Sequence, residues 1–129
     1  MFDHARVLAA LTGDPEFALH ARFWSCSLAI SIGDQVSLLK IRDGAPTSFA
    51  TGDGPAEVRI SAPADGWGLM MSPLPPPFFH DLMAAVAREG FSLDGANLDH
   101  DFRPYYPAIR RLIEVMRACT EEASHAEVR

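Results

Sequence analysis

The first half of the sequence alternates large hydrophobic residues with small or polar ones, a period of two that predicts strands. The clearest run places Trp24, Cys26, Leu28, Ile30 and Ile32 on one face, with small side chains between them. The four runs cover residues 24–32, 36–42, 47–51 and 56–61. Glycine-containing turn signals separate them, so we expect an antiparallel, mostly meandering arrangement.

Helical spacing of apolar residues flanks these strands. A stripe from Phe2 to Leu11 predicts an N-terminal helix, which ends at a Thr-Gly-Asp-Pro sequence. A short helix is expected directly after the fourth strand, with Ser61 or Ala62 at its N-cap and Pro63 in its first turn.

The last third of the chain predicts two more helices with a short strand between them. Three consecutive prolines at 75–77 favour a stiff, extended entry. A helical stripe then begins at Phe79 and ends at Gly90, and the fifth strand follows at 91–93. The best-patterned helix covers 102–116, and we expect residues 120–129 to form a frayed tail.

Taken together, the elements predict one α+β domain over residues 1–129. Its architecture would be an antiparallel five-stranded sheet covered on one face by the helices. A chain of 129 residues with 48% hydrophobic content is large enough for one core, and a second independent core is not expected.

Charge and hydropathy exclude several classes of partner. The 17 acidic residues outnumber the 11 basic ones, and a net charge of -6 disfavours nucleic acids and anionic membranes. No apolar run approaches the ~20 residues of a spanning helix, and the first residues do not resemble a signal peptide. We therefore expect a cytoplasmic protein with no membrane insertion. Cys26 and Cys119 suggest neither a disulfide framework nor a metal site, and each is expected to be a small buried hydrophobe.

Two short clusters contain candidate acid-base groups. His100 lies between Asp99 and Asp101, which would raise its pKa toward a value useful for general acid-base catalysis. The alternative is that one of these aspartates caps the last helix while His100 faces solvent. His80 and Asp81 form the second cluster, and here the alternative is an ordinary polar helix start. The sequence contains no glycine-rich phosphate loop, metal-spaced histidine pair or Gly-x-Ser-x-Gly elbow, and no cofactor is predicted.

Three stretches of the chain carry a family resemblance. They are the turn Ile41-Arg42-Asp43-Gly44, the strand Ala56-Glu57-Val58-Arg59-Ile60-Ser61 followed by a helix with Trp67 and Leu69, and Gly90-Phe91-Ser92-Leu93-Asp94-Gly95 before the closing helix. Together they resemble the sterol-carrier-protein-like, or sterol-transfer, family over about residues 15–117. The resemblance implies helices over one face of a five-stranded sheet and a tunnel that holds sterols, fatty acyl chains or similar molecules.

The sequence departs from the family pattern at two places. The segment 72–79 is proline-rich where the family has a glycine-bearing turn, and 102–107 contains two prolines where a plain apolar helix is usual. Both departures lie where the mouth of the tunnel is expected.

The resemblance, and the methionine and aromatic residues on three separate helices, predict binding of a hydrophobic small molecule without covalent chemistry by this chain. The ligand would lie between the sheet and the last two helices. The residues expected to line it are Trp67, Met70, Met71, Phe78, Phe79, Met83, Tyr106, Ile109 and Ile113.

Other functions remain open from the sequence. The proline-rich segment suits docking to a partner, so the chain could be an accessory domain or subunit of a hydrolase. It could also be a small enzyme with a cone-shaped pocket, with His100 or His80 and either Asp99 or Asp101 as its acid-base pair. If the segment is not folded over a ligand, Trp67, Met71, Leu74 and Phe78 would form an apolar patch, which predicts a homodimer.

Overall fold

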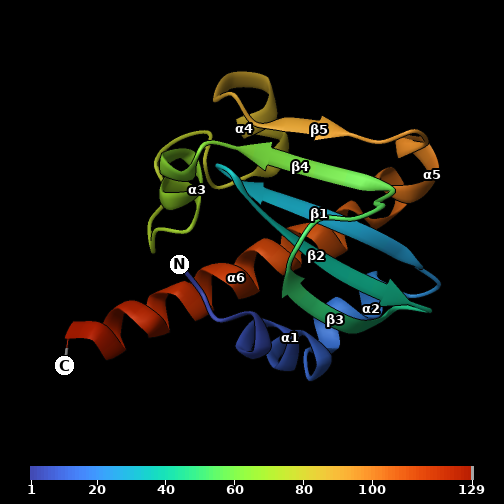
Figure 1. Ribbon diagram of the computed structural model, residues 1–129, viewed down its shortest axis with the longest axis horizontal. Helices are drawn as coiled ribbons and strands as arrows, with labels where there is room; N and C mark the ends of the chain where they lie inside the picture. The colour runs from blue at the N-terminus through green and yellow to red at the C-terminus, as the bar shows by residue number, and fades with distance from the viewer. Residues whose placement is uncertain (129) are drawn as a thin grey trace.

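A computed structural model describes residues 1–128, and the side chains of residues 1–120 (Figure 1). The helices are α1 (His4–Thr12), α2 (Pro15–His20), α3 (Ala64–Met70), α4 (Leu82–Arg88), α5 (Leu98–Asp101) and α6 (Tyr106–Val128), and a 3₁₀ turn, η1 (Arg103–Tyr105), precedes α6. The strands are β1 (Cys26–Ile32), β2 (Gln35–Arg42), β3 (Ala45–Thr51), β4 (Val58–Ala62) and β5 (Ser92–Asp94). The long α6 runs across one face of the sheet in Figure 1.

The strands form one five-stranded sheet in the order β3-β2-β1-β4-β5, within the described residues. Its pairs are antiparallel except one, because β4 runs parallel to β1, with Ile60 beside Ile30. The expectation of a fully antiparallel, meandering sheet is wrong at this point. The reason is burial: β4 buries Val58 and Ile60, whereas β3 buries only Phe49, so the more apolar strand lies next to the central β1.

Alternation places the large apolar side chains of the strands on one face. Leu28 and Ile30 of β1 are buried there together with Leu39 of β2 and Val58 and Ile60 of β4. The helices pack on this face: α1 contacts β3, and both α1 and α2 contact α6. The prediction of a helical layer over one face of a five-stranded sheet is confirmed.

The N-terminal helix forms as predicted, and His4 in its first turn is half-buried against β2 and β3. Its Nε2 lies 2.7 Å from the Ser37 Oγ, and its ring packs 4.7 Å from the ring of Phe49. Burial lowers the pKa of His4. The sequence pattern also missed α2, which starts with Asp14 as N-cap and Pro15 in the first turn.

The boundaries of α3 and α4 differ from those predicted. Ser61 and Ala62 belong to β4, and Pro63 is the N-cap of α3 without a capping side-chain hydrogen bond. The helix expected from Phe79 begins only at Leu82. Asp81 is extended, with φ -136° and ψ 129°, and its side chain accepts from the Ala84 N–H as the N-cap, so the helix starts after it.

The closing helix begins at Tyr106 rather than at Phe102 because Pro104 and Pro107 both fall near its start, where an α-helix tolerates proline only in the first turn. The backbone of α6 is helical to Val128. The tail expected at residues 120–129 lies mostly outside the residues whose side chains are described. Within the described part of the chain, no helix has the length and hydropathy to span a membrane.

Candidate ligand-binding site

An apolar groove of about 360 Å³ lies where α4, β5 and α5 meet the beginning of α6. The side chains that line it are Met83, Leu93, Leu98, Asp99, Phe102, Arg103 and Tyr106. Met83 is 41% exposed, whereas Leu82 and Ala85 of the same helix are buried. The rim is polar, since Asp99 and Arg103 form an ion pair of 3.1 Å there.

The turn between β5 and α5 positions one wall of this apolar groove. A Cβ atom on Gly95 would lie 2.5 Å from the Glu57 carbonyl oxygen and 2.7 Å from Leu98 Cδ2. Only glycine therefore lets the chain pass so close to the loop before β4 and bring Leu98 into the wall.

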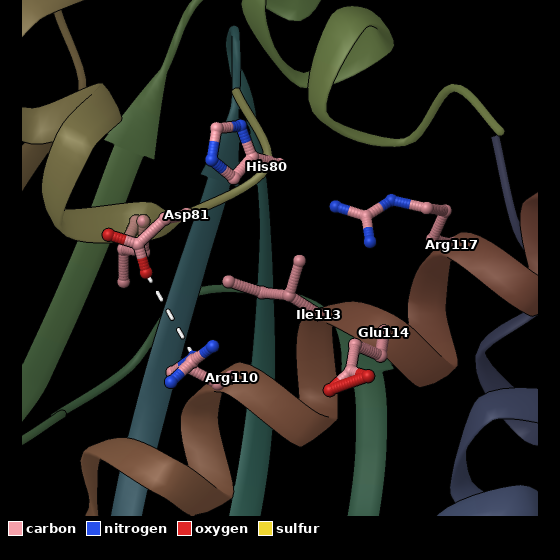
Figure 2. A pocket seen from close by; sticks show the side chains of 7 residues that line it. His80, Asp81, Arg110, Ile113, Glu114 and Arg117 are labelled. Atoms are coloured by element: carbon pink, nitrogen blue, oxygen red, sulfur yellow. Dashed lines mark ion pairs between the residues drawn. The ribbon is translucent and has the colours of Figure 1, made fainter. Parts of the chain in front are cut away.

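A second, polar pocket of about 220 Å³ lies further along α6 (Figure 2). Its lining residues are His80, Asp81, Leu82, Arg110, Ile113, Glu114 and Arg117. Figure 2 shows His80 and Asp81 on the segment that leads into α4, facing Arg110 and Arg117 on α6, with Ile113 between them. The pocket thus combines charged walls with an aliphatic floor.

One hydrogen bond stands between the apolar groove and the polar pocket. The Tyr106 hydroxyl donates to Asp81 Oδ1, and Asp81 Oδ2 accepts from the Ala84 N–H at 3.2 Å as the N-cap of α4. Burial, and then the hydrogen bond to Asp81, raise the pKa of Tyr106 to about 12. The same contact therefore fixes the start of α4 to α6 and separates the two cavities.

The predicted lining residues fall into four environments. Met83 and Tyr106 line the apolar groove, and Ile113 lines the polar pocket. The buried ones are part of the core: Trp67, Met70, Met71, Phe79 and Ile109. Phe78 is 39% exposed, with the guanidinium of Arg88 over its ring.

The sequence pattern missed three residues of the groove, namely Leu93, Leu98 and Phe102. Leu98 and Phe102 are four residues apart, a spacing that places two apolar side chains on one helical face. That spacing is the available signal in the sequence, but Phe102 also fits the start of the predicted helix 102–116.

Of the candidate acid-base groups, only His80 and Asp81 lie in the same cavity, the polar pocket. His100 Nδ1 lies 2.9 Å from Asp101 Oδ1, but the His100 side chain is 77% exposed and outside both cavities. His80 lies in the polar pocket, whereas Asp99 lies at the rim of the apolar groove. Neither Asp99 nor Asp101 caps the last helix, because both belong to the separate helix α5.

Both cysteines are buried thiols, as expected, and they form no disulfide with each other. Burial raises the pKa of the Cys26 thiol to about 12, which keeps it in its unreactive protonated form.

The fold was compared with solved structures. The chain superposes on a crystal structure of sterol carrier protein 2 with a TM-score of 0.73 and 21% identity, covering 91% of this chain and 97% of that one. Its fold is the sterol-carrier-protein fold. The resemblance found in the sequence is confirmed at the level of the fold.

Two further structures share the sterol-carrier-protein fold. One is the solution structure of a conserved protein from Thermus thermophilus, described as possibly a sterol carrier protein, with a TM-score of 0.70, 20% identity and coverage of 92% of this chain and 89% of that one. The other is a UbiJ-SCP2 ubiquinone synthesis protein, with a TM-score of 0.56, 12% identity and coverage of 88% and 86%. No protein-family model and no curated protein sequence matches the chain.

Proposed function

We propose that the chain binds a hydrophobic small molecule, such as a lipid, a sterol or an acyl chain, in the apolar groove beside α4. The observation that carries this proposal is the groove itself, in a fold shared with sterol carrier protein 2. Its volume of about 360 Å³ falls at the lower end of the roughly 300–1,000 Å³ typical of small-molecule sites.

The residues around the groove support adaptable apolar binding. Met83 is flexible and polarisable, and the Tyr106 hydroxyl lies beside it, within 3.4 Å of the Met83 N–H. The buried residues Met70, Phe79 and Ile109 belong to the core beneath the helices. A ligand larger than the groove would enter by displacing these side chains, which is how the deeper predicted lining residues would take part.

Displacement of a neutral apolar dye, Nile red, by dodecanol tests this function. We expect the wild type to bind both molecules, and Met83→Asp and Leu98→Asp to lose at least tenfold in affinity because each places a charge in the groove. Leu19→Asp is the matched control, since Leu19 is 62% exposed on α2 and outside the groove. A wild type that binds neither molecule would overturn the function. An equal loss in the control would remove the groove as its site.

We also propose that the chain forms a homodimer through the proline-rich segment. Of the four residues expected in an apolar patch, Trp67 and Met71 are buried, whereas Leu74 is 91% and Phe78 39% exposed. A symmetric dimer would cover both exposed side chains with one self-complementary surface. Sedimentation velocity measures this association.

A further inference from the structure

The polar pocket contains a guanidinium, that of Arg117, whose hydrogen-bonding capacity the described residues satisfy only in part. Arg117 donates from Nε to the carbonyl oxygen of Met70 at 2.9 Å, whereas its Nη2 is buried and has no hydrogen-bond partner there. In Figure 2 its guanidinium points across the pocket toward His80. A buried, unsatisfied guanidinium nitrogen is costly, so an acceptor brought by a ligand would be strongly favoured.

The other charged groups of the pocket do not neutralise Arg117. Asp81 already accepts from Tyr106 and from the backbone of α4, and Arg110 stands 4.0 Å from it. Glu114 faces Arg111, at 3.7 Å. His80 also lines the polar pocket. Arg110 and Arg117 therefore present guanidinium donors to one small space, in which Asp81 forms an ion pair of 4.0 Å with Arg110 and Arg117 forms none with the described residues.

The polar pocket and the apolar groove share one face of α6. Tyr106, Arg110, Ile113 and Arg117 follow each other at spacings of four, three and four residues, which places them on one helical stripe. From Tyr106 to Arg117 the helix rises roughly 16 Å at 1.5 Å per residue. Between these ends lies the aliphatic floor of Leu82 and Ile113.

We propose that the polar pocket binds the anionic head of an amphipathic ligand, a carboxylate or a phosphate, while the apolar tail of the ligand lies in the groove. Arg117 and Arg110 hold the head through charge-assisted hydrogen bonds, for which the planar guanidinium is well suited. The inference rests on the proposed function, since the tail uses the same groove. A ligand that spans both cavities displaces the hydrogen bond between Tyr106 and Asp81.

Calorimetric titration with dodecanoate, dodecanol and inorganic phosphate tests the proposal at neutral pH. We expect dodecanoate to bind about tenfold more tightly than dodecanol, because one charged hydrogen bond contributes about that factor. Arg110→Gln and Arg117→Gln should each bring the ratio of the two affinities close to one. Arg42→Gln, which removes the same charge from the exposed end of β2, should leave both affinities unchanged.

The outcomes separate the two proposals. Equal affinities of the wild type for dodecanoate and dodecanol would overturn the anionic site and leave the apolar function standing, whereas no binding of either would overturn the function. Phosphate binding that depends on Arg110, without dodecanoate binding, would show a free-phosphate site and overturn the amphipathic ligand. Arg110 is 64% exposed, so its substitution tests the site even if Arg117→Gln fails to fold.

Discussion

The two short helices α2 and α4 are each attached to α6 through the aspartate at their N-cap, but the partner of this aspartate on α6 differs. In each, an aspartate caps the helix and also reaches α6. Asp14 accepts from the Phe17 N–H and binds Arg111 through two hydrogen bonds of 2.8 Å. Asp81 accepts from the Ala84 N–H and from the hydroxyl of Tyr106.

The difference lies in the partner on α6. A guanidinium gives Asp14 a bidentate, charged contact, which fixes both the position and the orientation of α2. A phenol gives Asp81 one hydrogen bond from a neutral group, and the guanidinium of Arg110 lies at the longer distance of 4.0 Å. The contact with the phenol separates the apolar groove from the polar pocket. The comparison indicates that α2 is a fixed part of the helical layer, whereas α4 is attached by a contact that a ligand can replace.

The largest expected effect is the loss of stability when the α2 attachment is removed. Asp14→Ala should lower the free energy of unfolding by about 2 kcal/mol, of which about 1 is the N-cap and the rest the partly exposed pair with Arg111. Asp81→Ala should cost only about 1 kcal/mol, mainly its cap. Urea denaturation followed by tryptophan fluorescence measures both.

Asp34→Ala is the control for these variants, because Asp34 lies in the exposed turn between β1 and β2, and surface changes cost less than about 0.5 kcal/mol. A loss for Asp81→Ala as large as that for Asp14→Ala would contradict the distinction between a fixed and a replaceable helix.

A smaller effect, of about 1 kcal/mol, should distinguish the two attachments by pH. The hydrogen bonds from Arg111 hold the pKa of Asp14 below its ordinary 3.8, so its contribution is complete above that pH and is lost as the pH falls through the lowered value. The pKa of Tyr106 is raised from 10 to about 12, so its contribution is present below pH 10 and is lost as the pH rises toward 12.

Urea midpoints of the wild type and two variants across both pH ranges check these signs. Asp14→Asn should flatten the acid side only, and Tyr106→Phe the alkaline side only. Tyr105→Phe is the control for the second, because the Tyr105 hydroxyl donates to the Phe23 carbonyl rather than to a carboxylate. An alkaline loss that persists in Tyr106→Phe would assign it to another group.

The smallest expected effect on stability concerns the exposed apolar residues near α4. Leu74→Asp with Phe78→Asp should leave the free energy of unfolding of the monomer unchanged within about 0.5 kcal/mol, measured at a protein concentration low enough to dissociate a dimer, because both side chains are at the surface. The double variant should nevertheless sediment as a monomer where the wild type sediments as a dimer. A monomeric wild type, or a dimeric variant, would contradict the proposed interface.

The elements of the fold followed from local patterns, but the position of β4 did not. Alternation along 56–61 predicts a strand without naming its neighbour, and short turns favour pairing with the preceding strand. The pairing of β4 with β1 depends on which strand has more apolar surface to bury, a property of the whole sheet. The sequence pattern did not predict α2 for a different reason. This helix has six residues, fewer than two helical turns, which is too short to show a periodic pattern.

The sequence predicted some of the residues that line the candidate site, but not which of them face a cavity and which are buried in the core. Met83 and Tyr106 were chosen because they lie on apolar stripes, and they do line the groove. Trp67 was chosen for the same reason, but its indole N–H donates to the Ser31 carbonyl and the ring is fully buried. A stripe identifies a buried face, but only packing decides whether that face meets another side chain or a cavity.

The parallel pairing of β1 with β4 also has a consequence for the order in which the chain is synthesised. The hairpin of β1 and β2 closes over a short turn, and β3 adds to its outer edge as soon as it emerges. The other edge of β1 must wait for residues 58–62. Until then, the most apolar strand of the sheet presents unpaired N–H and C=O groups to any neighbouring chain, so a ribosome that pauses between β3 and β4 exposes the segment most prone to aggregation.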